Sequence, residues 1–195
     1  MDARDAILKA TIKLFGEVGS RGATTRRIAQ EAGVNEVTLF RHFQSKEELI
    51  GEALRSFAEH MTMKSLPADP VHPEAELGEW CRDHYRQLYK IRSFIRKSMG
   101  EYEEHPGRCE HAMHVSIRIA TDLTNYLTAL QRKGLASTGW DPRAAAAMLM
   151  GAIFADALGR DTMPERYPYP MREAVDKYLQ LFFEAIAITR DRTSS

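Results

Sequence analysis

Cysteine is nearly absent from this chain, and so are long apolar runs. Cys81 and Cys109 are the only cysteines among 195 residues; two cannot build a disulfide framework, which predicts a reducing, cytoplasmic setting. The sequence has no apolar run of the roughly 18 residues that a membrane span needs, so we expect no membrane partner. The N-terminal residues lack the basic-then-apolar order of a secretion signal, in agreement with a cytoplasmic location.

Net charge is absent as well. Lys plus Arg and Asp plus Glu both number 27, so the chain is not a histone-like polycation. Apolar residues make up 44% and charged residues 28% of the sequence, which excludes wholesale disorder. The charge is uneven locally, because residues 21–46 hold five Lys and Arg side chains against two Glu side chains, a balance of +3. A basic segment of this kind can contact phosphate.

Helical periodicity runs through nearly the whole chain, and no segment shows sustained period-two alternation. We therefore predict an all-α fold of about nine helices. Three prolines within residues 66–73 interrupt the pattern, since proline cannot continue a helix. Thr24, Asn35, Ser45 and Asp141 precede predicted helices as N-caps. The expected helices span residues 2–17, 25–31, 36–42, 74–90, 91–104, 107–133, 142–159 and 170–189, with a further helix that opens at Ser45.

The segment most informative about function is residues 24–46. Two short predicted helices flank a turn centred on Gly33, with Ala29 four residues before it and Leu39 six residues after it. A small residue where two helices cross, a glycine for the turn and an apolar anchor are typical of a helix-turn-helix. In that motif the second helix enters the DNA major groove. The shape alone also occurs in other three-helix bundles.

Residues 24–49 resemble the DNA-binding signature of the TetR family of bacterial transcriptional regulators, with the sequence TTRRIAQEAGVNEVTLFRHFQSKEEL in register. The chain departs from the signature where Asn35 replaces the usual Ser and Phe40 the usual Tyr, whose hydroxyl often reaches a phosphate. The resemblance implies an N-terminal three-helix helix-turn-helix DNA-binding domain at residues 1–46. It also implies a helical ligand-binding and dimerisation domain at residues 47–195.

Side-chain chemistry suggests roles within this signature. Thr25 and Arg26 begin the first short helix, where free N–H groups favour phosphate, and Val37 near the start of the second can contact a thymine methyl. Arg41 is suited to guanine or to phosphate, with plain solvation as the alternative for it and for Glu36. The predicted DNA contacts are Thr25, Arg26, Asn35, Glu36, Val37, Thr38, Phe40, Arg41, His42 and Lys46.

Dimerisation through the last two long helices is implied by the resemblance, and the sequence agrees with it. Residues 142–159 carry a stripe of small residues that permits close helix approach, and residues 170–189 carry a stripe of larger apolar ones. Two such helices from each subunit would form a four-helix interface in a homodimer. The alternative for both stripes is packing within one subunit. The predicted interface comprises Met148, Gly151, Ala152, Ala155, Leu179, Phe182, Phe183 and Ile186.

An effector pocket is predicted among the helices between residues 74 and 133, where apolar walls carry a few polar groups. Its predicted lining is Trp80, His84, Tyr85, Leu88, Met99, Tyr102, Met113, Ile117 and Thr121. The lining favours a small hydrophobic or aromatic molecule, with plain core packing as the alternative for each residue. A basic edge at Arg92, Arg96 and Lys97 makes an anionic, lipid-like effector the second option.

No cofactor, metal or enzyme activity is expected. His105, Cys109, His111 and His114 lie close together in sequence and have the ligand types of a zinc site, although a solvated helix start is the preferred interpretation. The chain has no nucleophile motif, glycine-rich phosphate loop or paired-carboxylate constellation. A helical enzyme would also leave the signature at residues 24–49 unexplained.

Together these features predict a ligand-responsive transcriptional regulator. As a repressor, the dimer would bind a palindromic double-stranded DNA operator, and a small-molecule effector would release it. Activation of transcription, and a response to a protein partner in place of a small molecule, are the alternatives that the sequence leaves open.

Overall fold

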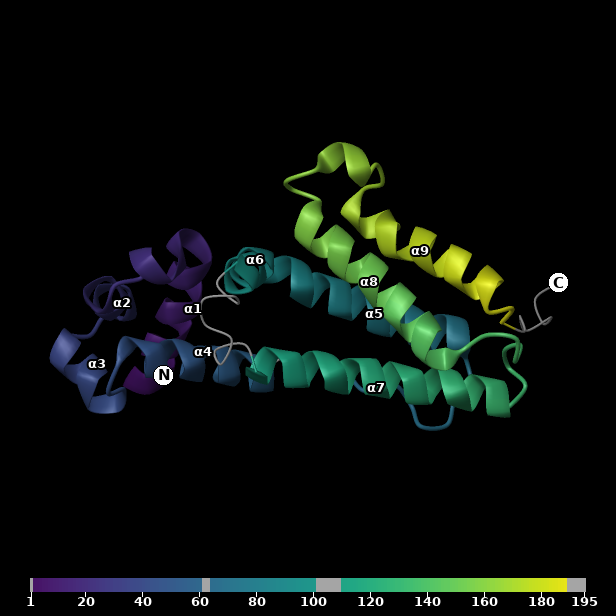
Figure 1. Cartoon of the computed structure of the whole chain (residues 1–195), viewed down its shortest axis with the longest axis horizontal. Coiled ribbons are helices and arrows are strands. Elements are labelled where there is room, and N and C mark those ends of the chain that lie inside the picture. The colour runs from purple at the N-terminus through teal and green to yellow at the C-terminus, as the bar shows by residue number, and fades with distance from the viewer. Residues whose placement is uncertain (1, 61–63, 101–109, 189–195) are drawn as a thin grey trace. The chain divides into compact units, whose positions relative to one another are not determined.

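The computed structural model describes residues 2–60, 64–100 and 110–188. These ranges hold nine α-helices and one short 3-10 turn but no strand, which confirms the predicted all-α fold (Figure 1). The elements are α1 (Ala3–Gly22), α2 (Thr25–Ala32), α3 (Glu36–His42), α4 (Lys46–His60), α5 (Pro73–Lys90), α6 (Arg92–Gly100), α7 (Glu110–Arg132), α8 (Pro142–Gly159), η2 (Pro164–Arg166) and α9 (Met171–Ala185). None of these helices has both the length and the hydropathy of a membrane span.

The predicted N-caps are confirmed at four helix starts. Thr24, Asn35, Ser45 and Asp141 each accept a hydrogen bond from a backbone N–H two or three residues further on. The Oδ1 atom of Asn35, for example, accepts from the backbone nitrogen of Thr38 at 2.7 Å. Such bonds satisfy donors that the first turn of a helix leaves free. They explain why α2, α3, α4 and α8 begin where the sequence predicts.

The first helix is interrupted near its predicted end at residue 17, because Gly19 kinks it, and helical geometry resumes after that kink. α1 runs to Gly22, and within it only Gly19 leaves helical geometry, with a φ of 72°. That φ lies in the left-handed region, which glycine adopts without steric penalty. Gly16 stays helical, and a Cβ placed on it would lie 3.3 Å from the Oγ atom of Ser93. Its missing side chain therefore lets α1 and α6 approach closely.

The chain divides into two compact units. The first comprises residues 1–62 and 91–116, and the second comprises residues 63–90 and 117–195. We expected a boundary after residue 46 that divides the residues for DNA contact from those for effector binding and dimerisation. That functional boundary stays a prediction.

In the first unit, α1 is the central helix, and α2, α3, α4 and α6 all pack against it. A buried apolar cluster joins the first four helices and includes Ile7, Leu14, Ile28, Leu39, Phe43 and Leu49. Phe15 and Phe94 join α1 to α6, with ring centroids 5.2 Å apart. Because α2 and α3 are far too short to persist alone in water, this packing fixes where the helix-turn-helix lies.

In the second unit, α5 packs against α8 and α9, which also pack against each other. Figure 1 shows α8 and α9, in green and yellow, as neighbouring helices joined by the loop that contains η2. The buried side chains of this unit include Leu77, Tyr85, Leu127, Ile153 and Leu179. Each unit thus has its own apolar core.

Candidate nucleic-acid interface

The turn between α2 and α3 depends on Gly33. Its φ of 70° and ψ of 27° are left-handed, and the backbone nitrogen of Val34 donates to the carbonyl oxygen of Ala29 at 2.9 Å. The left-handed glycine and this hydrogen bond end α2 and redirect the chain into α3. The predicted glycine-centred turn is therefore confirmed.

The third helix presents one side to the core and the other to solvent. Leu39 is fully buried, and Phe43 directly after the helix is buried as well. Val37 and Arg41, one helical turn apart, lie on the opposite side and are exposed, with Phe40 exposed beside them. An anchor on one side thus leaves the other side free for a partner, as DNA recognition by this helix requires.

Two polar side chains at the start of α3 are already engaged within the protein. The Oδ1 atom of Asn35 is used as the helix cap. The Oε1 atom of Glu36 accepts a hydrogen bond from the Oγ1 atom of Thr25 at 2.7 Å, which joins the start of α2 to the start of α3. Sequence reasoning treated Thr25 and Glu36 as separate DNA contacts, and the structure brings them together as a pair.

Some basic residues of the segment form hydrogen bonds within the protein, and others do not. The Nζ atom of Lys46 donates to the carbonyl oxygen of Ser20, and Arg27 donates to the carbonyl oxygen of Gly22 at 3.0 Å. Arg26 and Arg41 are exposed, and within the described ranges neither side chain has an ion-pair or hydrogen-bond partner.

These contacts separate two kinds of cation. Arg26 and Arg41 are available to an external anion, whereas Lys46 already holds the start of α4 to the end of α1. His42 is exposed at the end of α3, with its ring centroid 6.3 Å from that of Phe43. The predicted contact residues therefore lie along α2, α3 and the first residue of α4, all within the first unit.

The predicted effector lining is only partly assembled. Trp80, His84, Tyr85 and Leu88 are buried along α5, with the Trp80 and His84 rings stacked at 5.4 Å. Burial lowers the pKa of His84 to about 4, so this imidazole is neutral near neutral pH. Four of the predicted residues therefore share one buried helix face.

The other predicted lining residues are placed differently. Ile117 and Thr121 on α7 are exposed, and Met99 on α6 is exposed in the first unit. Tyr102 and the side chain of Met113 lie outside the described part of the chain. The pocket stays a prediction.

The zinc cluster considered above also falls on residues whose side chains are not described. Among the side chains that are described, no group of three or more His, Cys, Asp or Glu residues is placed to hold a metal ion.

The predicted dimer residues fall into two groups. Met148, Gly151 and Ala155 are exposed along one side of α8, with Ala152 half-buried between them. On α9 the predicted residues lie mostly inside the subunit, since Leu179, Phe182 and Ile186 are buried and Phe183 is half-buried.

Leu181 is an exposed apolar residue in the second half of α9, which sequence reasoning missed. Phe182 and Phe183, next to Leu181, belong to the larger apolar stripe of α9. Periodicity alone therefore favoured that stripe, which packs mostly within the subunit, as the dimer interface.

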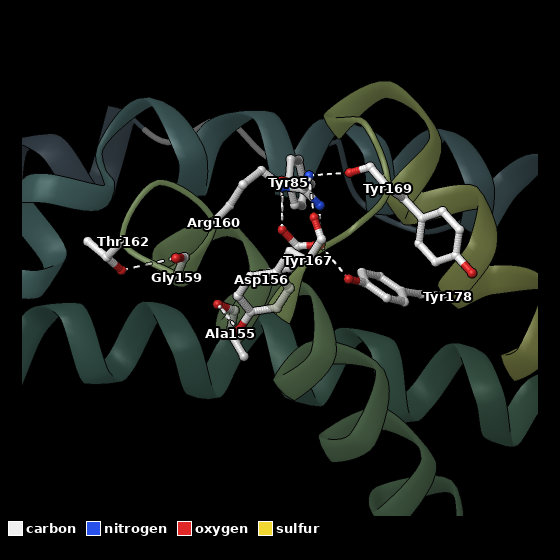
Figure 2. Close-up of polar contacts among 9 residues, drawn as sticks. All are labelled: Tyr85, Ala155, Asp156, Gly159, Arg160, Thr162, Tyr167, Tyr169 and Tyr178. Atoms are coloured by element: carbon white, nitrogen blue, oxygen red, sulfur yellow. Dashed lines mark hydrogen bonds and ion pairs between the residues drawn. The ribbon is translucent and has the colours of Figure 1, made fainter. Parts of the chain in front are cut away.

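An ion pair near the end of α8 joins this helix to its neighbours (Figure 2). Asp156 on α8 is fully buried, and Arg160 contacts both of its carboxylate oxygens at 2.7 Å. Tyr85 of α5 donates to the Oδ1 atom at 3.0 Å, and Tyr178 of α9 donates to the Oδ2 atom. Burial raises the pKa of Tyr85 to about 12, so the phenol keeps the proton that it donates. The network therefore ties three helices together.

The same arginine also holds the loop between α8 and α9. Arg160 donates to the carbonyl oxygens of Tyr167 and Tyr169. The Tyr167 hydroxyl donates to the carbonyl oxygen of Ala155 at 2.9 Å, so the loop folds back onto α8 (Figure 2). The sequence feature that could have indicated this network is Asp156, the one acidic residue of α8.

Comparison with known proteins identifies the helix-turn-helix segment of the first unit. The family described as bacterial regulatory proteins, tetR family, matches residues 7–53, the stretch from α1 into α4 that carries the helix-turn-helix. The chain belongs to the TetR family. It is a helix-turn-helix, DNA-binding regulator of transcription, as the signature predicted.

Individual relatives extend this result along the chain. The uncharacterised HTH-type transcriptional regulator YvkB of Bacillus subtilis is 27% identical over 93% of this chain and 95% of its own length. The HTH-type transcriptional repressor KstR2 of Mycobacterium tuberculosis is 43% identical over 54 residues, which are 28% of this chain and 27% of that protein. This chain thus matches only about a quarter of KstR2.

Fold similarity covers nearly the whole chain. The crystal structure of a putative TetR-family transcriptional regulator from Mesorhizobium loti matches with a TM-score of 0.77 and 21% identity, over 94% of this chain and 96% of that one. The helices after α4 therefore also follow the architecture of the TetR relatives.

Proposed function

We propose that this TetR-family protein is a cytoplasmic transcriptional repressor that binds a palindromic operator as a homodimer. The observation that carries the proposal is the outward side of α3. Leu39 anchors α3 to the core from the opposite side, and Asn35 caps the helix. Arg26 and Arg41 are exposed and have no ion-pair partner among the described residues. Exposed arginines beside a protruding helix supply phosphate attraction and groove contacts together. KstR2 of Mycobacterium tuberculosis, to which this chain is 43% identical over 54 residues, is a repressor.

Dimerisation follows from the limited reach of one recognition helix. A single short helix contacts only a few base pairs, so two copies on half-sites about 34–36 Å apart are needed for specificity. The exposed side of α8 is suited to such an interface, because Gly151 and Ala155 let a partner helix approach and Met148 supplies apolar area. Leu181 is an exposed apolar residue of α9, the other helix of the expected interface.

Effector control is the second part of the proposal. The α5 face with Trp80 and Leu88 supports a small hydrophobic or aromatic molecule as the effector. The molecule would release the dimer from its operator by binding the DNA-free state more tightly, because a ligand shifts an equilibrium only by its differential affinity.

The deciding experiment is recovery of the operator. Purified protein is mixed with fragments of its source genome at about 150 mM salt, since nonspecific binding depends steeply on salt, and the retained DNA is sequenced. A short inverted repeat is the expected product. Arg26→Ala and Arg41→Ala should lose it, whereas Arg132→Ala, an exposed arginine of the second unit, should keep it. Retention of no defined sequence by the effector-free protein would contradict the proposal.

Three observations would redirect this proposal. Catalytic turnover of a candidate effector would favour a helical enzyme. Displacement of the DNA by a cell extract only while its proteins are intact would favour a protein partner in place of a small molecule. Increased transcription from a promoter beside the operator would favour an activator.

A further inference from the structure

The outward side of α3 is apolar where a base-reading helix usually carries hydrogen-bonding groups. Val37 is 71% exposed and Phe40 is 49% exposed. They are three positions apart, so their side chains project from neighbouring positions on one helix face. Apolar side chains exposed to water are unfavourable in the free protein. Val37 and Phe40 would be stabilised by an apolar group on the partner that covers this side of α3.

Two polar side chains at the start of α3 each have an oxygen atom bound within the protein. An asparagine reads adenine through its amide, and a glutamate accepts from cytosine N4. The amide oxygen of Asn35 is used by the backbone nitrogen of Thr38, and a carboxylate oxygen of Glu36 is used by the hydroxyl of Thr25. Each of these two oxygen atoms would have to share or give up its hydrogen bond to read a base.

Phe40 is also free of the hydrogen-bonding role that a tyrosine would have, because its ring has no hydroxyl for a phosphate. The neighbouring cation Arg41 and the exposed Arg26 on α2 point to DNA, rather than a second protein, as the occupant of this surface. The apolar group that DNA presents in the major groove is the C5 methyl of thymine.

We propose that Val37 and Phe40 are specificity-determining residues that read thymine by its C5 methyl group. This proposal rests on the proposed function, since it needs an operator in which α3 occupies the major groove. It requires thymines at fixed positions in each half-site whose methyl groups contact these two side chains. Arg41 then supplies the polar contact of the same surface.

The test removes the methyl group and nothing else. In synthetic duplexes of the recovered operator, each thymine is replaced in turn by deoxyuridine, which keeps the base pair and its O4 acceptor. Affinity should fall about fourfold at a contacted position in one half-site and about 15-fold when both half-sites are changed, as expected for one buried methyl group each. Thymines outside these positions should be replaceable without loss.

Protein variants assign the effect to its side chains. Val37→Ala should weaken binding to the thymine duplex and leave less than about a twofold penalty for uracil at its own position, because the methyl contact is already gone. Phe40→Ala should do the same at a different position. Val71→Ala is the matched control, since Val71 is a similarly exposed valine of the second unit, and it should keep the full uracil penalty.

The outcomes separate this proposal from the one on which it rests. If the thymine duplex binds specifically and every uracil duplex binds equally well, the methyl reading is wrong while the repressor function stands. The same holds if the uracil penalty is unchanged in Val37→Ala and Phe40→Ala. If the thymine duplex itself binds no better than random DNA, both proposals are overturned. Because the uracil series uses the unaltered protein, it decides the question even where a variant folds poorly.

Discussion

In the first unit, Arg26 and Arg41 lie exposed without an ion-pair partner among the described residues, whereas in the second unit Asp156 is fully buried and both of its oxygens are bound. Both regions carry charge at a place that matters to the proposed function. The exposed arginines are available to DNA and contribute little to the fold. The buried carboxylate fixes α5, α8 and α9 to one another and is unavailable to any partner. If the proposed function is right, charge at these two sites serves binding in the first unit and stability in the second, and substitutions should separate the two effects.

The largest effect is expected from Arg160→Ala. It leaves the buried carboxylate of Asp156 without its cation, and loss of one partner of a buried pair costs about 3–5 kcal/mol of unfolding free energy. Urea unfolding followed by circular dichroism measures this loss. Arg172→Ala is the control, because its pair with Glu173 is exposed and should contribute less than about 1 kcal/mol. Equal losses of unfolding free energy in the two variants would contradict the special contribution of the buried pair.

The second prediction concerns binding alone. Arg26→Ala should weaken operator binding by about 25-fold at about 150 mM salt, because a dimer loses two phosphate contacts at about fivefold each. The slope of log affinity against log salt should become shallower by about 2. Binding titrations at several salt concentrations measure both values. The unfolding free energy should not change, and a fall like that of Arg160→Ala would show that the first unit also uses surface charge for stability.

The third prediction concerns backbone geometry, which we expect to contribute to the stability of the first unit. Gly33→Ala should cost about 1–2 kcal/mol, since the φ of 70° is unfavourable for a residue with a Cβ even though nothing lies within 4 Å. Gly51→Ala, inside α4 with equally open surroundings, should stabilise the protein by about 0.5–1 kcal/mol. Thermal unfolding of the two variants gives the comparison. Effects of the same sign would mean that backbone geometry is not the cause.

The smallest effect should come from His84 in the second unit. Its pKa is about 4 in the folded protein, below the ordinary value of 6.5, so the unfolded chain binds the extra proton between these values. Stability is therefore complete above about pH 6.5 and is lost as pH falls towards 4, with about 1 kcal/mol lost between about pH 7 and about pH 5.5. Denaturant titrations at both pH values measure it. His84→Gln should remove this contribution, and an unchanged pH dependence in that variant would assign it to other groups.

The sequence predicted local structure better than contacts between helices. The starts of α2, α3 and α8 follow from Thr24, Asn35 and Asp141, because a cap bonds to the backbone only two or three residues away. The DNA-binding signature lies in the same short range, so the position of the candidate interface could be predicted from it.

Contacts between distant residues could not be predicted in this way. The hydrogen bond from Thr25 to Glu36 joins two helices, and the contact of Lys46 with Ser20 joins segments 26 residues apart. On α9, periodicity shows that two apolar sides exist, but only packing decides that Phe182 faces the subunit core and Leu181 faces solvent. Each of these depends on the folded arrangement, which no single stretch of sequence encodes.

The seven-residue helix α3 separates its own anchoring from its contact surface. Leu39 and the Asn35 cap hold it in place, while Val37, Phe40 and Arg41 take no part in the core. Those three positions can therefore vary without unfolding the domain. Gene duplicates of this protein could acquire new target promoters by a few substitutions there, and a randomised library of residues 37, 40 and 41 is a direct route to retargeting it in the laboratory.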